Sequence, residues 1–394
     1  MGFVLLLVGI DIVAVVVAYG FFAIPALLYG RLYPSRYLKR YDPQYTPHTS
    51  VFVPFKGGAA DLAAQVEAFL RLANERTRLF FLVESEQDAA WPVIRELVAE
   101  KANASLVVAG LATSCAQKNH NLLAGIEAAG HEDEVYVFLD SVTTFTPQQL
   151  HDLVMPLSDP KVTVSAGFRW DVLKTKTLGE RLRAFMIALQ WALMNCPCSN
   201  ATWGGGTAIR RADFEALGVS DYWAKTAVDD MTMVRILLGA KRQRVFVPTC
   251  VKEMESNVPT IKGAVLWFKR QALYLKFYLR PYWLFTVALL TISSINVLGF
   301  PILLVCSMIW PARILNLLAF ITGVFTLLMM ICCQATKRPA DDHYGRLLWF
   351  LLSPMYLVLS CCAYLMGAWT RVLHWRDVSY RLDRHGCVQE IIRH

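Results

Sequence analysis

Four long apolar stretches dominate the hydrophobic pattern of the chain. The first, Phe3–Tyr29, carries a single charged residue, Asp11. The other three contain no Asp, Glu, Lys or Arg, and they are Trp283–Trp310, Ile314–Gln334 and Leu347–Ala368. A helix of about 20 apolar residues crosses a bilayer. The pattern therefore predicts a multi-pass integral membrane protein, with one transmembrane helix in residues 1–30 and further transmembrane helices in residues 282–369.

The first apolar stretch has two interpretations, a permanent anchor or a cleaved signal peptide. A signal peptide begins with a basic segment and ends at a cleavage site of small residues. Phe3–Tyr29 is not preceded by a basic segment and has no such site. We therefore expect an anchor.

Short β-type runs alternate with helical stretches after the first apolar segment. The runs expected as strands are Val51–Phe55, Leu79–Val83, Leu106–Ala109, Val135–Leu139, Val162–Gly167 and Val245–Pro248. Such alternation is typical of a doubly wound α/β sheet, and we place this domain at residues 46–261. Ligands of such sheets bind beyond the carboxyl ends of the strands. The acidic run that begins at Glu84 and the carboxylate of Asp140 are both expected at this edge.

The formal net charge of +8 over 394 residues fits a protein at a membrane surface. Basic residues cluster directly after the first apolar stretch, in residues 31–40, and directly before the second, in residues 262–280. Because basic loops stay in the cytoplasm, both flanks of the α/β domain are expected to face the cytosol. The sequence carries no nucleic-acid-binding motif, so we expect anionic lipid headgroups, not nucleic acid, to attract this charge.

The C-terminal end presents a topological conflict. Three spans in residues 282–369 would put the tail, residues 370–394, opposite the α/β domain, but the five arginines of the tail favour the cytosol. Trp283–Trp310 would extend about 42 Å as one helix, and Gly299 and Pro301 interrupt it. We therefore expect a broken segment there and a basic tail that packs on the α/β domain.

Two further helical segments mix apolar and aromatic residues with Arg or Lys. They are residues 177–194 and residues 262–281. This composition is typical of helices that lie in the plane of a membrane surface. We expect both to be interfacial and to hold the α/β domain at the bilayer, where a lipid hydroxyl can enter.

A series of short motifs follows the predicted strand ends. In chain order they are Lys56-Gly57, Val83-Glu84, Gln117-Lys118-Asn119-His120-Asn121, Leu139-Asp140-Ser141, Trp203-Gly204-Gly205-Gly206, Val228-Asp229-Asp230, Arg270-Gln271, and the tail pieces Trp375-Arg376 and Tyr380-Arg381-Leu382. In this order, between membrane segments, they resemble the GT-A glycosyltransferases of family 2, and among them the ceramide-glucosyltransferase-like branch of family 21. The resemblance covers Val51–Arg280 and resumes near the C-terminus. It implies a GT-A fold for the α/β domain.

The resemblance implies a nucleotide-sugar site with a divalent cation, Mg²⁺ or Mn²⁺, that neutralises the diphosphate. Asp140 is the implied metal ligand. The family's Asp-x-Asp motif reads Asp140-Ser141-Val142 here, without the second carboxylate. A strand-terminating aspartate in an Asx-turn is the alternative interpretation.

Three more residues are implied at the nucleotide. Glu84 and Glu86 are expected at the base and ribose, with a solvated acidic loop as the alternative. Lys118 begins a helix after a polar loop, where its ammonium and the helix amides would face a diphosphate. A solvated lysine is the alternative there.

The implied catalytic residues are Asp230, a general base for the acceptor hydroxyl, and Asp229, whose like charge raises the pKa of that base. An acidic pair that only stabilises a helix start is the alternative. Trp203 and Gly205 are expected to give the sugar an aromatic face and close backbone approach. Arg270 and Gln271 are expected to contact the nucleotide sugar, although Leu273 and Tyr274 replace the Arg-Trp of the family motif.

These features together predict an inverting glycosyltransferase that moves one sugar from a nucleotide-diphosphate sugar, a UDP-hexose, to a lipid hydroxyl. The resemblance implies a ceramide-like acceptor. One alternative is a processive polysaccharide synthase, which three C-terminal spans and the altered Arg-x-x-Leu-Tyr oppose. The other is a non-catalytic membrane scaffold with a decayed transferase fold, which the incomplete Asp-x-Asp favours and the intact Asp229-Asp230 pair opposes.

Overall fold

The computed structural model describes residues 2–28, 38–58, 61–196, 198–256, 258–336 and 345–394. The chain divides into two compact units. The sheet unit comprises Pro34–Arg169, Asn200–Lys252 and Arg371–His394, and the helical unit comprises Met1–Tyr33, Trp170–Ser199 and Glu253–Thr370. The α/β domain expected at residues 46–261 thus contributes residues to both units.

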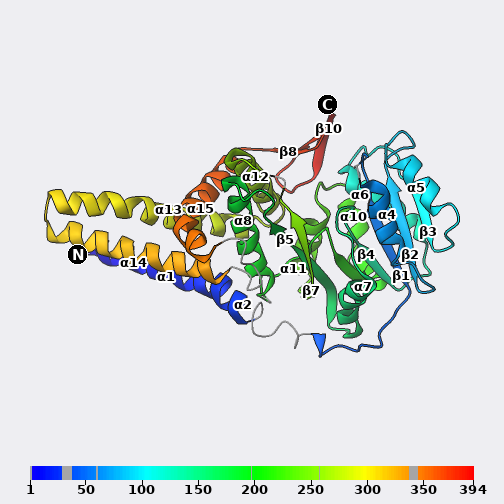
Figure 1. Ribbon diagram of the computed structural model, residues 1–394, viewed down its shortest axis with the longest axis horizontal. Coiled ribbons are helices and arrows are strands. Elements are labelled where there is room, and N and C mark those ends of the chain that lie inside the picture. The colour runs from blue at the N-terminus through cyan, green and yellow to red at the C-terminus, as the bar shows by residue number, and fades with distance from the viewer. Residues whose placement is uncertain (1, 29–37, 59–60, 197, 257, 337–344) are drawn as a thin grey trace. The chain divides into compact units, whose positions relative to one another are not determined.

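A seven-stranded mixed sheet forms the centre of the sheet unit, in the order β3-β2-β1-β4-β6-β5-β7 (Figure 1). The strands are β1 (Thr49–Pro54), β2 (Thr77–Val83), β3 (Ala104–Val108), β4 (Val135–Phe138), β5 (Val162–Val172), β6 (Thr207–Arg210) and β7 (Gln243–Glu255). β1 pairs in parallel with β2 and β4, and β2 pairs in parallel with β3. β6, which the hydrophobic pattern did not predict, is antiparallel to both β4 and β5.

Alternate residues of the strands face two separate hydrophobic cores. Val51 and Val53 belong to one core, with helices α4 (Leu62–Leu70), α5 (Trp91–Val98) and α7 (Pro147–Val154). Phe52 belongs to the other core, with helices α6 (Gln117–Ala129), α9 (Arg211–Ala216), α10 (Val219–Trp223) and α11 (Asp229–Gly239). Because strands buried on both faces need helices on both sides, the arrangement confirms the predicted doubly wound α/β sheet.

The parallel strands β1, β2 and β4 end at one edge of the sheet. Lys56, Glu84 and Asp140 follow these three strands within two residues of their last positions. The polar motifs are thus gathered at the carboxyl edge, where ligands of such sheets bind.

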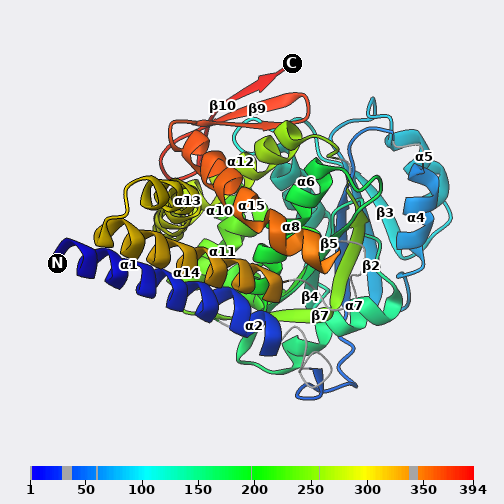
Figure 2. The ribbon, with the colours of Figure 1, turned by 60° about the vertical axis from the view of Figure 1, so that its left-hand side comes forward.

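Helices make up most of the helical unit. They are α1 (Gly2–Ala18), η1 (Tyr19–Ala23), α2 (Ile24–Leu27), α8 (Leu178–Met194), α12 (Ile261–Tyr278), α13 (Arg280–Ile309), α14 (Arg313–Ala335) and α15 (Arg346–Ala368). Within the described residues, four segments are long and apolar enough to cross a membrane, namely Val4–Leu27, α13, α14 and α15. Helices α1 and α14 lie side by side (Figure 2).

The expected break between Trp283 and Trp310 is wrong. α13 is one continuous helix of 30 residues, with Pro301 inside it. Proline is tolerated in membrane helices because neighbouring helices and local adjustments satisfy the freed backbone groups. One polar contact joins this helix to the N-terminal one, since Asn296 Nδ2 donates to Asp11 Oδ1 over 2.9 Å. Asp11 therefore has a partner inside the helical unit, as an acidic residue in an apolar helix requires.

The helices expected at the membrane surface, α8 and α12, pack on each other and on α15. Phe185 of α8 contacts Trp349 and Tyr356 of α15, with ring centroids 5.3 and 4.7 Å apart. A buried ion pair reinforces this packing, because Arg183 Nε lies 2.8 Å from Asp171 Oδ2. α15 is therefore covered by protein over much of its length.

The C-terminal tail folds into a three-stranded antiparallel sheet in the order β10-β9-β8. Its strands are β8 (Val372–Trp375), β9 (Val378–Leu382) and β10 (Val388–Arg393). This C-terminal sheet belongs to the sheet unit. It is held there by Arg393 Nη2, which donates to Ala112 O over 2.7 Å, and by Tyr380, whose hydroxyl accepts a hydrogen bond of 3.2 Å from the amide of Gln117.

Candidate active site

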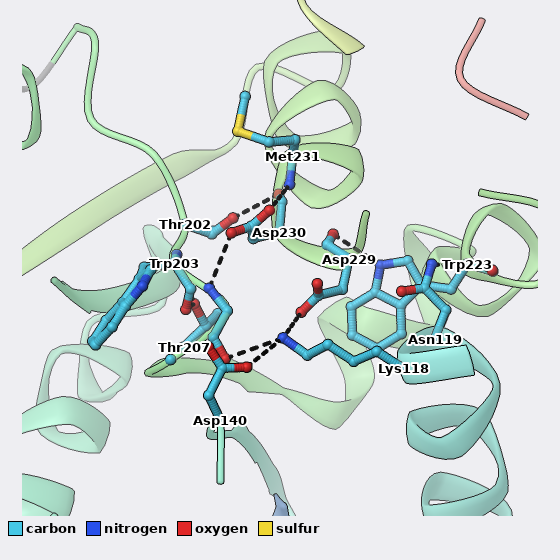
Figure 3. Close-up of polar contacts among 12 residues, drawn as sticks. Lys118, Asn119, Asp140, Thr202, Trp203, Thr207, Trp223, Asp229, Asp230 and Met231 are labelled. Atoms are coloured by element: carbon cyan, nitrogen blue, oxygen red, sulfur yellow. Dashed lines mark hydrogen bonds and ion pairs between the residues drawn. The ribbon is translucent and has the colours of Figure 1, made fainter. Parts of the chain in front are cut away.

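Lys118, the second residue of α6, lies at the centre of an acidic cluster (Figure 3). Its Nζ is 2.7 Å from Asp140 Oδ1 and 2.9 Å from Asp229 Oδ2. Burial by itself lowers the pKa of Lys118, but the Asp140 and Asp229 carboxylates outweigh it, so the pKa lies above its ordinary value. The lysine is therefore a permanent cation that connects the strand-end aspartate to the acidic pair at the start of α11.

Asp230 follows Asp229 in the sequence, but its carboxylate makes different contacts from that of Asp229. Its Oδ2 accepts a hydrogen bond of 3.1 Å from the amide of Gly204, and its Oδ1 accepts one of 2.6 Å from the amide of Met231. Burial raises the pKa of Asp230, and the Asp229 carboxylate raises it further. The charge of Lys118 and the two amide hydrogen bonds offset part of this rise, and the resulting pKa is about 7. A carboxylate with that pKa is suited to accept and release a proton near neutral pH.

The backbone around the acidic pair is held by two residues outside the sequence motifs, Thr202 and Trp223, and by Asn119 of the Lys118 motif. Trp223 Nε1 donates to Asp229 O over 3.1 Å, and the Thr202 hydroxyl donates to Asp230 O over 2.8 Å. Asn119, beside Lys118, donates through Nδ2 to Trp223 O and Thr226 O. These contacts fix the start of α11 and hence the direction of both carboxylates. Of these three supporting residues, only Asn119 stands in a sequence motif, next to Lys118.

The loop of glycines after Trp203 packs against the cluster. A side chain at Gly204 would meet Lys118 Nζ at 2.6 Å and Asp229 Oδ2 at 3.1 Å. One at Gly205 would meet the Trp203 ring at 2.3 Å. These glycines therefore allow close approach to Lys118, Asp229 and Trp203 of the protein itself. Trp203 is half-buried and contacts Phe168 with ring centroids 6.1 Å apart.

The acidic residues expected at the nucleoside are placed differently from each other. Glu84 Oε2 lies 3.3 Å from Lys56 Nζ, so the ends of β1 and β2 are joined by an ion pair. Glu86 is exposed on the following loop. Glu84 is thus part of the strand-end edge, whereas the structure does not bring Glu86 to the other site residues.

Arg270 and Gln271 lie on α12, in the helical unit, while the other predicted site residues belong to the sheet unit. Both side chains are partly buried. Their assignment to the nucleotide sugar remains a sequence-based prediction.

The donor set at Asp140 fits a divalent cation that takes most of its ligands from elsewhere. Oδ1 of Asp140 contacts Lys118, and Oδ2 has no hydrogen-bond partner among the described residues. The side chain is 37% exposed. No group of three acidic, His or Cys side chains in the described part of the chain is arranged to hold a metal. Because Mg²⁺ commonly uses one or two carboxylates with phosphates and water, this single carboxylate is sufficient if a diphosphate is bound.

The recess beside the acidic pair is too small for a sugar. Asp229 and Asp230 line a cavity of about 10 Å³ together with Phe138, Trp223 and Met233 among others. This is about the space that one water molecule needs. The cluster meets solvent at Asp140, whose side chain is partly exposed.

Comparison with known proteins places the chain in a family. No curated protein sequence matches it. A solved mannosyltransferase from Pyrobaculum calidifontis, in complex with GDP-Man and Mn²⁺, is 17% identical, with a TM-score of 0.46 over 92% of this chain and 99% of that one. A glucosyl-3-phosphoglycerate synthase from Mycobacterium tuberculosis, with Mn²⁺, UDP-glucose and glycerol 3-phosphate, is 15% identical, with a TM-score of 0.32 over 54% of this chain and 71% of that one. Likenesses this distant carry no argument about chemistry.

The family assignment comes from the sequence, because the profile of glycosyl transferase family 21 matches residues 15–388. The match spans both units and most of the C-terminal sheet. It confirms the resemblance inferred from the motifs and, with the observed mixed sheet, the GT-A type of fold. The chain belongs to glycosyl transferase family 21 and is a glycosyltransferase.

Proposed function

We propose that the protein catalyses inverting transfer of one hexose from a nucleotide-diphosphate sugar, a UDP-hexose, to the hydroxyl group of a membrane lipid such as a ceramide-like acceptor. The observation that carries the proposal is the placement of Asp230, whose carboxylate is held by the amides of Gly204 and Met231 next to the Asp229–Lys118 ion pair. In this position the pKa of Asp230 is about 7. Family membership supports the transferase chemistry. The apolar helices support a lipid acceptor.

Asp230 would act as the general base. Its carboxylate takes the proton of the acceptor hydroxyl while the acceptor oxygen forms a bond to the anomeric carbon. The bond from that carbon to the diphosphate oxygen breaks, and its electron pair leaves with the nucleoside diphosphate. Attack from the side opposite the leaving group inverts the anomeric configuration. Asp229 serves this step by raising the pKa of Asp230.

Lys118 and Asp140 would serve the leaving group. The Lys118 ammonium is held 2.7 Å from Asp140, at the strand end where a diphosphate would lie. Its charge stabilises the negative charge that develops on the departing diphosphate. A Mg²⁺ or Mn²⁺ ion on Asp140 would supply further Lewis-acid neutralisation of that charge. Lys56 and Glu84 would then lie toward the nucleoside end of the donor, because they follow β1 and β2, which are one strand and two strands away from β4 and Asp140.

A panel of UDP- and GDP-hexoses, offered to the detergent-solubilised full chain with and without ceramide, tests the proposal. We expect one donor to be consumed with formation of a β- or α-glycosylated lipid whose anomeric configuration is opposite to that of the donor. The Asp230→Asn variant should form no product above a small residual rate. Transfer to a growing polysaccharide, or a product with retained configuration, would contradict the proposal.

A further inference from the structure

The hairpin between β8 and β9 reaches the nucleoside end of the candidate site. Its two turn residues are Arg376 and Asp377. Arg376 Nη1 donates to the carbonyl of Lys56 over 2.6 Å, and Asp377 Oδ1 lies 3.3 Å from Lys56 Nζ. The same Lys56 ammonium is 3.3 Å from Glu84. A chain of three charges therefore connects the C-terminal sheet to the carboxylate expected at the base and ribose.

The backbone of Arg376 adopts a conformation that arginine rarely takes. Its φ is +52°, in the left-handed region that favours glycine. Such strain persists only where surrounding contacts determine it, and it is concentrated at functional positions. Glycine would fit this turn with less strain, so the presence of arginine is consistent with a use for its side chain.

The guanidinium of Arg376 has hydrogen-bond donors that are available to a ligand. Apart from the Nη1 bond to Lys56, neither Nε nor Nη2 has a hydrogen-bond partner among the described residues. The group also lies over Gly57, where a side chain would come within 3.8 Å of Nη1. Arginine presents its donors in a fixed planar fork that suits phosphate and nucleobase acceptors.

The hairpin is held firmly against the sheet unit. The hydroxyl of Tyr380 accepts from the first amide of α6, next to Lys118. At the other end of the C-terminal sheet, the amide of Val388 donates to Lys225 O over 2.8 Å. Thr226 and Cys387 form an isolated antiparallel β-bridge there. A preorganised arginine loses little conformational entropy on binding a ligand.

We propose that the C-terminal sheet completes the nucleotide site, with Arg376 as a binding residue for the donor nucleotide and Asp377 as the positioning residue that holds Lys56 and, through it, Glu84. This inference rests on the proposed function, because it needs a nucleoside diphosphate at the strand ends. It assigns a task in donor binding to residues more than 300 positions away from Lys56 in the sequence.

Arg376→Gly removes the side chain without disturbing the turn, because glycine readily adopts the left-handed backbone conformation. The variant therefore reports the effect of the side chain alone. Arg381→Gln is the matched control, since Arg381 lies in the same small sheet but pairs with Glu390, at 2.9 Å, instead of with the strand ends. UDP and GDP binding to the solubilised full chains is measured by calorimetry, and kcat and KM for the donor by transfer assay.

We expect Arg376→Gly to weaken binding of the preferred nucleoside diphosphate at least about tenfold, the scale of one hydrogen bond to a charged group. The KM for the donor should rise while kcat changes little. Arg376→Lys should recover part of the affinity, and Arg381→Gln should behave as the unmodified protein.

Equal nucleotide affinity in Arg376→Gly and the unmodified protein would overturn the inference and leave the proposed function standing. Absence of UDP and GDP binding by the unmodified protein would overturn both. An equal loss in Arg381→Gln would also overturn the inference, because it would assign the effect to the small sheet as a whole.

Discussion

Two recessed clusters of opposite charges, one in each unit, are built in contrasting ways. In the helical unit, Arg183 and Asp171 are 4% and 0% exposed, lie 2.8 Å apart, and the guanidinium stacks 4.8 Å from the Trp267 ring. In the sheet unit, Lys118 contacts two carboxylates but remains 26% exposed, and Asp140 is 37% exposed.

The difference separates a structural ion pair from a reactive one. A fully buried pair has no access to a substrate, so its charges only hold elements together. In the Lys118 cluster the carboxylates outnumber the cation, and Oδ2 of Asp140 has no hydrogen-bond partner among the described residues. Burial and the Asp229 carboxylate raise the pKa of Asp230. A charged substrate can bind to charges and hydrogen-bond acceptors that face solvent and are not already paired within the protein.

The largest effect expected from this contrast is on stability. Arg183→Met removes the buried ion pair with Asp171, and breaking such a pair costs roughly 3–5 kcal/mol. Lys118→Met should cost much less, because water reaches Asp140. Thermal unfolding of the solubilised variants measures both. The double variant Arg183→Met/Asp171→Leu should recover most of the lost stability. Equal destabilisation by Arg183→Met and Lys118→Met would contradict the distinction between a structural and a reactive ion pair.

The next effect is on turnover. Asp230→Asn keeps the shape of the side chain but removes the base, so kcat should fall by at least roughly a hundredfold. Nucleotide binding should persist, because among the described residues the hydrogen bonds of the Asp230 carboxylate come from backbone amides. Asp221→Asn, at an exposed position of α10, is the control. Near-normal turnover in Asp230→Asn would refute the assignment of the base.

A smaller effect is expected on metal-dependent binding. Activity should require Mg²⁺ or Mn²⁺, and Asp140→Ala should abolish the increase in UDP affinity that Mn²⁺ produces, roughly tenfold by the strength of one charge-assisted contact. Calorimetry with and without Mn²⁺ measures this increase. Full activity in excess EDTA would show that Lys118 alone neutralises the diphosphate.

The pH profile should reveal the coupling between the two aspartates. Since the pKa of Asp230 is raised from 3.8 to about 7, the base is protonated at lower pH, and kcat should rise with pH and level off above about 7. Asp229→Asn removes the like charge that raises this pKa, so the rise should move to lower pH. An unchanged profile in that variant would assign the limb to another group.

The smallest perturbation probes topology. Because the C-terminal sheet contacts Lys56 and Gln117 within the sheet unit, we expect that sheet and the rest of the sheet unit to lie on one side of a membrane, with an even number of crossings between α12 and the tail. We expect α13 and α14 to cross and α15, covered by α8 and α12, not to cross completely. Single cysteines at Gln389 and Ala312, in a background without Cys198 and Cys362, should react with an impermeant thiol reagent from opposite sides. Labelling of both from the same side would contradict this topology, and labelling of Gln389 from outside intact cells would refute a cytosolic tail.

Local pattern determined much of this protein. Apolar runs without charges specified the long helices, because a helix in lipid must be apolar on all sides. Alternating strand and helix runs specified the doubly wound sheet, and short polar runs after the strands marked its carboxyl edge. The break expected at Gly299 and Pro301 failed because backbone groups freed by proline are satisfied by neighbours that the sequence does not reveal.

Only the tertiary structure decided how the charges meet. The sequence motifs indicate Lys118, Asp140 and Asp229 separately, and the bridging position of the lysine arises from packing of α6, β4 and α11 around one strand edge. The same holds for the C-terminal sheet, whose Arg376 and Asp377 reach Lys56 across 320 residues or more. Secondary structure follows from local periodicity, whereas pairing between distant charges depends on loop closure and burial that no local pattern encodes.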